Sequence, residues 1–393
     1  MSTNRITVQP QSAVRRRQFL LTAAAGLAAA RCAPAAAPPP PAVSPSQAPA
    51  AGAPGAAAWE KDWESLVSAA RAEAAFGIIT ISGTTYRQWL SAFEEAFPGI
   101  KVELNQVPQV QAYVSRLLEE RKAGVYGVDL LLTGVLVLPG LKAAGAVDPL
   151  RPLLIRPDVI DDKNWRDGFN GGWQDNDKQL GYNGAEDVLS AHINTDLVKD
   201  GEIKSVQDLL DPKWKGKIMW IDPRTSGFTA GPMTAIRLKY GEDTVKRLLV
   251  DQQPAFSRDN RQITEGLLRG TYALATGVTQ PVLDQFLQQG LGKNVKFVDI
   301  VDFATTGSGD GLWMMNRAPH PNATKLFVNW ALTKAGQESY SKTVAGNSRR
   351  ADVAPATPER LPRQGQTYFR NLESTVPEVV KTRAFIATLL GNA

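Results

Sequence analysis

The chain has 393 residues, 43% of them hydrophobic, which allows one large or two medium domains with a sizeable core. The formal charge of +5 comes from the first 57 residues, which hold five arginines and no acidic residue, while the remainder balances 39 basic against 39 acidic residues. This neutral body argues against nucleic-acid binding, and one cysteine with two histidines argues against disulfides, thiol chemistry and a His-based zinc or triad enzyme.

Residues 1–32 predict a signal for export. Three arginines, Arg15 to Arg17, precede an apolar run over 20–30, which is too short for an ordinary transmembrane helix. The pair Arg16-Arg17 followed two residues later by Phe19 resembles a twin-arginine signal. A general secretion signal with three arginines is the alternative. Either signal predicts a location in the periplasm or on the outer face of the cytoplasmic membrane.

Cys32 lies where a lipoprotein carries its lipid-modified cysteine, so a lipid anchor to the membrane is one expectation. The arginine before it fits that role poorly, and residues 28–30 offer a cleavage site ahead of Cys32, so both outcomes stay open. Residues 33–58 are almost wholly Ala, Pro, Ser and Gly. Such a segment cannot bury enough apolar surface to fold, which predicts a disordered tether leading to a globular domain over 59–393.

Helices and strands alternate along this globular domain. We expect helices over 59–75, 86–97, 109–123, 222–239, 262–269, 320–332 and 336–344. We expect strands over 77–81, 101–105, 128–132, 217–221, 272–276, 295–300 and 313–315. This alternation predicts an α/β fold with mainly parallel sheets flanked by helices. The glycines of 307–311 have the wrong spacing for a nucleotide loop and predict a mobile loop.

Ligands of such sheets sit beyond the carboxyl ends of the strands, where this chain has small polar loops. The candidate ligand-binding residues in these loops are Ser82, Gly83, Thr84, Thr85, Thr133, Gly134, Thr225, Ser226, Gly227, Arg258 and Gly277. They include no nucleophile–base pair and no nucleotide-binding motif, so we expect a binding protein without catalytic residues, cofactor or metal.

The segment 225–227 leads from a strand into a predicted helix, whose unpaired N–H groups favour an anion. Arg258 could add a bidentate guanidinium. We therefore expect a ligand with a carboxylate, phosphonate or similar group. Two simpler interpretations stay open: Ser226 is only a helix cap, and Arg258 is a surface residue paired with Asp259.

Two long stretches, 206–218 (VQDLLDPKWKGKI) and 320–330 (HPNATKLFVNW), resemble motifs of the extracellular solute-binding proteins, in the branch with ferric-ion-binding periplasmic proteins. The resemblance implies the type II periplasmic-binding fold, with two lobes that close on a ligand by a hinge. It implies a first lobe of about 59–192 plus 304–345 and a second of about 193–303 plus C-terminal helices. The chain would cross between them near 192–195 and 303–311.

The resemblance further implies a monomeric receptor that hands a small molecule to the permease of an ABC transporter. One departure matters: iron-binding relatives have an adjacent tyrosine pair where this chain has Gly277 to Pro281. The iron-transport role of those relatives is therefore not transferred to this chain, and a receptor for ferric ion or an iron chelate stays an alternative. Two less direct interpretations are a transferase on the same architecture and the sensing portion of a two-component system.

Overall fold

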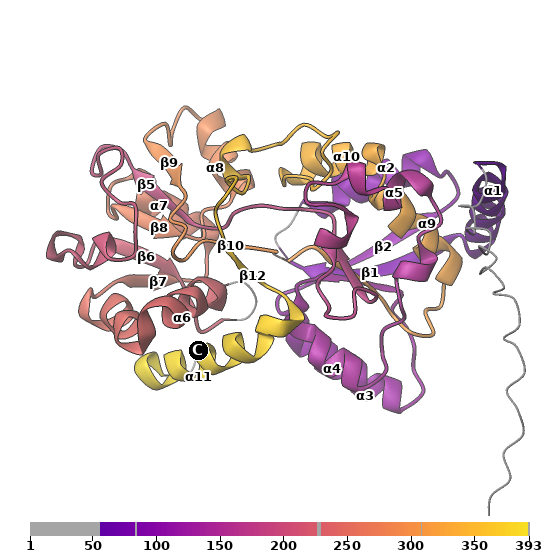
Figure 1. Ribbon diagram of the computed structural model, residues 1–393, viewed down its shortest axis with the longest axis horizontal. Helices are drawn as coiled ribbons and strands as arrows, with labels where there is room; N and C mark the ends of the chain where they lie inside the picture. Colours follow the sequence, from indigo (N-terminus) through magenta and orange to yellow (C-terminus); the bar gives the residue numbers. More distant parts are fainter. Residues whose placement is uncertain (1–55, 83–84, 226–228, 308, 392–393) are drawn as a thin grey trace, which may run out of the picture. The chain divides into compact units, whose positions relative to one another are not determined.

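A computed structural model describes residues 56–82, 85–225, 229–307 and 309–391 (Figure 1). The predicted leader with Cys32 and most of the tether lie outside the described residues, as do Gly83, Thr84, Ser226 and Gly227. Within the described part, no helix combines the length and the apolar character that crossing a membrane requires.

The first sheet has five strands: β1 Ala75–Ile81, β2 Lys101–Val107, β3 Leu130–Thr133, β4 Gly181–Asn183 and β11 Gly311–Met314. Their order is β2-β1-β3-β11-β4; β1 is parallel to both its neighbours, and β11 is antiparallel to both of its own. The predicted parallel arrangement is thus present in β2-β1-β3. The late strand β11 joins β3 to β4 and makes the sheet mixed.

Helices cover both faces of this sheet (Figure 1). They are α1 Ala56–Glu73, α2 Tyr86–Ala96, α3 Val110–Lys122, α4 Leu138–Ala143, α5 Pro157–Ile160, α9 Pro321–Ala331 and α10 Lys334–Val344. Side chains of β1 alternate between two cores, because successive strand residues point to opposite faces. Phe76 and Ile78 pack with α2 and α9, whereas Ile79 packs with α3 and α4.

The second sheet has the order β7-β6-β8-β5-β9. Its strands are β5 Ala191–Asn194, β6 Ile218–Ile221, β7 Ala255–Ser257, β8 Leu274–Thr276 and β9 Val295–Val298. β6 is parallel to β7 and β8, and β5 is antiparallel to β8 and β9. Its helices are α6 Ala230–Lys246, α7 Asn260–Leu268, α8 Gln280–Gln288 and α11 Val376–Leu390, and α11 packs on α6. A short parallel pair, β10 Thr305–Thr306 and β12 Phe369–Arg370, completes the described strands.

Aromatic side chains fill the core between β1, α2 and α9. The rings of Phe93 and Phe327 pack edge to face with their centroids 5.3 Å apart, and the ring centroid of Trp330 lies 5.4 Å from that of Phe93. Trp214 is buried in the core of the second sheet. The tryptophans of the two sequence motifs, Trp214 and Trp330, therefore serve packing, which is the usual role of large aromatic side chains in a core.

One local prediction is wrong. The helix expected to open at 222 begins at Ala230, because Asp222 organises a turn first: its carboxylate accepts the Arg224 N–H at 3.0 Å, and its carbonyl accepts the Thr225 hydroxyl at 2.7 Å. Such local side-chain bonds compete with helix formation. At the end of the segment expected to be a mobile loop, Asp310 accepts two tyrosine hydroxyls, and β11 begins at Gly311, two residues before the predicted strand.

Candidate functional site

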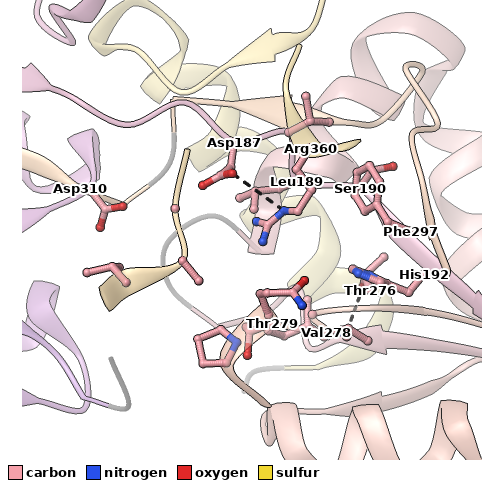
Figure 2. A pocket seen from close by; sticks show the side chains of 18 of the residues that line it. Asp187, Leu189, Ser190, His192, Thr276, Val278, Thr279, Phe297, Asp310 and Arg360 are labelled. Atoms are coloured by element: carbon pink, nitrogen blue, oxygen red, sulfur yellow. Dashed lines mark hydrogen bonds and ion pairs between the residues drawn. The ribbon is translucent and has the colours of Figure 1, made fainter. Parts of the chain in front are cut away.

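A cavity of about 220 Å³ opens where β8 ends and the chain passes from β4 to β5 (Figure 2). One side consists of residues 187–190 and His192, and the other of residues 276–281, which connect β8 to α8. Asp310 and Arg360, far apart in the sequence, also line it. The cavity therefore lies beyond a strand's carboxyl end, as expected for ligand sites of α/β sheets.

The turn from β8 into α8 forms a wall rich in hydrogen-bond donors. Gly277 has a φ of +87°, and a Cβ there would lie 2.7 Å from Ile221 Cβ, so only glycine fits without a shift. Thr279 is the N-cap of α8, and its side chain makes no capping hydrogen bond. The N–H groups of Gln280 and Val282 lack intrahelical acceptors, Pro281 between them has no N–H, and the helix dipole favours negative charge at this end.

His192 contributes a buried imidazole to the cavity. Its Nδ1 has no hydrogen-bond partner among the described residues, and its ring meets Phe297 edge to face at 5.3 Å. Burial, assisted by the nearby charge of Arg360, lowers the pKa of His192 to about 3. The ring is therefore neutral at physiological pH and can offer one donor and one acceptor to a ligand.

Asp187 and Arg360 form a loose ion pair on the same wall (Figure 2). Arg360 Nε lies 4.0 Å from Asp187 Oδ1 and has no hydrogen-bond partner among the described residues. Asp187 accepts hydrogen bonds from Asn347, at 2.9 Å from Nδ2 and 3.3 Å from the backbone N–H. Burial raises the pKa of Asp187 to about 6 despite Arg360. A ligand that engages Arg360 therefore competes with only a weak protein partner.

Asp310 connects the cavity to two helices. Its Oδ2 accepts the hydroxyl of Tyr340 from α10 at 2.6 Å, and its Oδ1 accepts the hydroxyl of Tyr86, the first residue of α2. Burial raises the pKa of Asp310 above its usual range, although both hydroxyl bonds act in the opposite direction. Burial and the Asp310 charge also raise the pKa of both phenols, so both hydroxyls stay protonated.

Two of the predicted site residues, Thr85 and Gly277, line this cavity. Thr85 precedes α2, and its hydroxyl is buried without a hydrogen-bond partner among the described residues. The helix start of α2 and that of α8 therefore both present polar groups to the cavity. Since helix N-termini attract anions, this arrangement adds to the donor character of the wall.

The structure places the remaining described candidates outside the lining of this cavity. Ser82 is exposed, and its N–H donates to Val107 O at 2.9 Å. The carbonyl of Thr133 accepts the Trp313 indole N–H at 2.9 Å, and Gly134 precedes a 3₁₀ turn. Ser82 follows β1, Thr133 is the last residue of β3, and Gly134 comes directly after it.

The expected anion anchor near 225 is only partly described. The Thr225 hydroxyl is used within the turn at Asp222. Arg258 is 53% exposed and pairs with Asp222 through Nε at 3.1 Å, so its partner is Asp222 rather than Asp259. Arg224 shares the same carboxylate at 2.9 Å. This arrangement ties three loop residues together at the end of β6.

Sequence reasoning missed Asp187, His192, Asp310, Tyr340 and Arg360 as members of one cavity. One signal was available: His192 is a polar residue in a short apolar stretch at the predicted crossing. No sequence pattern connects Asp187 with Arg360, because their proximity arises only when the segment after α10 returns across the fold. Among the described residues, no three His, Cys, Asp or Glu side chains group as a metal site.

The model of the family described as bacterial extracellular solute-binding protein matches residues 88–360. An uncharacterized protein of Haemophilus influenzae is 28% identical over 159 residues, which cover 38% of this chain and 44% of that relative, so the chain matches less than half of the relative's length.

Solved structures show the same fold. The apo ferric ion-binding protein A of Pasteurella haemolytica has a TM-score of 0.65 at 16% identity, over 81% of this chain and 99% of that one. Iron-bound HitA of Pseudomonas aeruginosa has a TM-score of 0.62 at 16% identity, over 80% and 99%. AfuA of Actinobacillus pleuropneumoniae, with fructose-6-phosphate bound, has a TM-score of 0.59 at 18% identity, over 81% and 99%. The chain thus belongs to the bacterial extracellular solute-binding proteins and has the fold of the type II periplasmic receptors of ABC transporters.

Proposed function

We propose that this protein is the exported receptor of an ABC importer and captures a small organic solute with an anionic group. The cavity beside α8 is the binding site, and the bound solute passes to a permease. One observation carries the proposal: the Arg360 guanidinium, the buried His192 imidazole and the start of α8 all face one cavity of about 220 Å³. Small-molecule sites are typically concave and mostly apolar, with a few convergent polar groups.

The donors in this cavity favour an acid group on the ligand. Arg360 Nε is buried without a hydrogen-bond acceptor among the described residues, and guanidinium groups bind carboxylates and phosphates in bidentate geometry. The carboxylates that line the cavity are each engaged by protein donors, Asp187 by Asn347 and Asp310 by two tyrosines. A sugar phosphate in the structurally similar AfuA supports the same class of ligand.

We propose that each sheet with its helices forms one lobe, about 59–192 plus 304–345 and about 193–303 plus the C-terminal helix. The segments between β4 and β5 and between β9 and β11 would be the hinge crossings. Residues 187–190 and Asp310, which line the cavity, lie in these segments. Ligand binding would therefore be coupled to hinge closure, which small-angle scattering measures as a smaller radius of gyration.

The first test identifies the solute. Native mass spectrometry of protein purified from its host should reveal a bound small molecule, and a thermal-shift panel of carboxylates, phosphate esters and phosphonates gives its class. A ligand at 100 times its dissociation constant adds about 2.7 kcal/mol of stability. An empty protein that no compound stabilises would contradict the proposal.

The second test concerns the site. Arg360→Gln should weaken binding of the best acid in the panel by roughly 10- to 100-fold, since a charged hydrogen bond contributes about 1.5–3 kcal/mol. Arg258→Gln is the matched control, because Arg258 is not among the residues that line the cavity. Ser226→Ala tests the anchor predicted from the sequence. If Arg360→Gln binds normally and Ser226→Ala does not, the anion lies at residues 225–227 instead.

A ferric ion or ferric chelate is a second candidate, favoured by the convergence of Tyr86, Tyr340 and Asp310. Phenolate and carboxylate oxygens are hard ligands suited to iron(III). In the free protein, however, both phenols are protonated and donate to Asp310, so iron would have to displace two protons and break both bonds.

A further inference from the structure

We infer that the solute carries a cationic group in addition to its anionic group, which makes it a small zwitterion such as an aminoalkyl carboxylate or aminoalkyl phosphonate. This inference rests on the proposed function and specifies the substrate class of the same cavity. The observation behind it is the set of charged residues that line the cavity: two carboxylates, Asp187 and Asp310, and one guanidinium, Arg360, carry a formal sum of −1, to which the proposed acid group adds a further negative charge.

The two carboxylates are near enough to affect each other. The charge of Asp310 adds to the effect of burial in raising the pKa of Asp187, and Arg360 opposes both. In Figure 2, Asp187 lies between Asp310 and Arg360. An acid group that binds Arg360 would weaken the only ion pair that Asp187 has among the described residues. Binding a simple anion would therefore leave two buried carboxylates without a counter-ion, which is costly in a protein interior.

Both carboxylates keep unused hydrogen-bonding capacity. A carboxylate offers about four lone-pair sites, whereas each oxygen of Asp310 accepts one tyrosine hydroxyl. Asp187 Oδ2 accepts the Asn347 N–H at 3.3 Å, which is a long hydrogen bond. An ammonium has three donors and no acceptor, which matches these free sites. It would donate hydrogen bonds to both carboxylates while the acid end of the same molecule binds Arg360 and the start of α8.

A simple amine fits the cavity less well than a zwitterion. An ammonium would balance the formal charge of the lining residues, but it offers no acceptor to the start of α8 or to Arg360, whose Nε has no hydrogen-bond partner among the described residues. Neutral His192 brings no charge to the cavity, and the N-terminus of α8 adds positive rather than negative potential. A zwitterion offers an acid group to Arg360 and an ammonium to the carboxylates, and it leaves the formal charge of the cavity unchanged, whereas a simple anion makes that charge more negative. The cavity, of about 220 Å³, has room for a small molecule.

The pH dependence separates a zwitterion from a simple anion. The groups that face Asp187 are Arg360, Asp310 with its two tyrosines, the amide of Asn347 and the neutral His192. Of these groups, Asp187, whose pKa is about 6, takes up a proton between pH 7.5 and 5.0, and that proton removes negative charge. Acidification should therefore weaken binding of a zwitterion and strengthen binding of an anion, for which Arg360 is released.

The experiment uses matched probes of two to five carbons: ω-amino carboxylates, the same carboxylates without the amine, and the same amines without the acid. Calorimetry on the whole protein at pH 7.5 should show at least one ω-amino carboxylate binding about tenfold more tightly than either of its halves. Its affinity should fall at least threefold at pH 5.0. Asp310→Asn should weaken it about tenfold without weakening the plain carboxylate, and Asp177→Asn, an exposed partner of Lys142, should change neither.

Three results would overturn the inference: a plain carboxylate that binds as tightly as its ω-amino counterpart, tighter binding of the ω-amino acid at pH 5.0, or a co-purified solute without a basic nitrogen. None of these removes the proposed function, since an anion would still be captured. If no probe binds and native mass spectrometry finds no bound solute, both the inference and the proposed function are refuted.

Discussion

Replacing Asp187 by asparagine should stabilise the free protein at neutral pH, although it removes a charged partner of Arg360. Burial raises the pKa of Asp187 to about 6, whereas an aspartate in an unfolded chain has a pKa of about 3.9. The folded state therefore binds this proton more tightly than the unfolded state. Its stability falls as pH rises through the window between these two pKa values and stays lower above pH 6.

The size of this effect follows from the two pKa values. A difference of about two units corresponds to about 3 kcal/mol of lost stability at pH 7.5, at 1.36 kcal/mol per unit. Asparagine keeps one oxygen for Asn347 Nδ2 and loses the weaker contact with its N–H, at a cost of about 1 kcal/mol. The variant should therefore gain about 2 kcal/mol at pH 7.5 and almost nothing at pH 4.5, where Asp187 is protonated in the folded protein.

Urea unfolding followed by the fluorescence of the nine tryptophans measures both differences. Asp302→Asn is a control of opposite sign. Burial acts to raise the pKa of Asp302 but is outweighed by bonds from Lys239, Tyr240 and the Val206 N–H, so its pKa is lowered. That variant should lose stability at pH 7.5. A D187N protein that is less stable than the wild type at pH 7.5, or equally changed at both pH values, would refute the reasoning.

Three further predictions concern separate parts of the chain. Gly277→Ala should lower the stability of the fold by several kcal/mol and impair ligand binding, because a positive φ and a 2.7 Å contact with Ile221 combine there. Gly290→Ala, where φ is positive but the space is open, should cost about 1 kcal/mol. Equal losses of melting temperature in the two variants would contradict this. Lysine at both Arg16 and Arg17 should block export in a fractionation assay if the signal is of the twin-arginine type, and normal export would exclude that type. Ferric citrate should give no visible tyrosinate band, because the two phenols around Asp310 are protonated and bound to that carboxylate; a strong band would favour the iron receptor.

Much of the fold could be predicted because its elements are periodic. The pattern of apolar residues identified β1, β2 and α2 within a few residues. The first crossing expected from the resemblance, near 192–195, falls largely on strand β5, and the lobe boundaries stay a prediction. The short strand β4 was missed because Gly-Tyr-Asn carries no β-strand pattern and is held by pairing with β11. The start of α6 was predicted too early, since the Asp222 turn depends on side-chain hydrogen bonds that periodicity does not register.

The cavity was predictable only where a loop follows a strand. Thr85 and Gly277 were found by that rule, and both line the cavity. Asp187, Asp310 and Arg360 were not, because they lie in connecting segments whose positions depend on the whole tertiary structure. Their burial, rather than their residue type, gives them shifted pKa values and unpaired atoms. A sequence without an alignment carries no information about that burial.

The insertion of β11 between β3 and β4 determines the order in which the sheets can be completed. All strands of the second sheet lie within one continuous stretch, from β5 to β9, whereas the first sheet pairs Leu130 with Met314, which the chain reaches only after β9. A growing polypeptide that has reached β9 can close the second sheet, but its strands β3 and β4 still lack their partner β11. Distant pairings of this kind slow folding, and exposed strand edges favour aggregation. A nascent chain that ends near β9 is therefore the state in which this protein would depend most on chaperones.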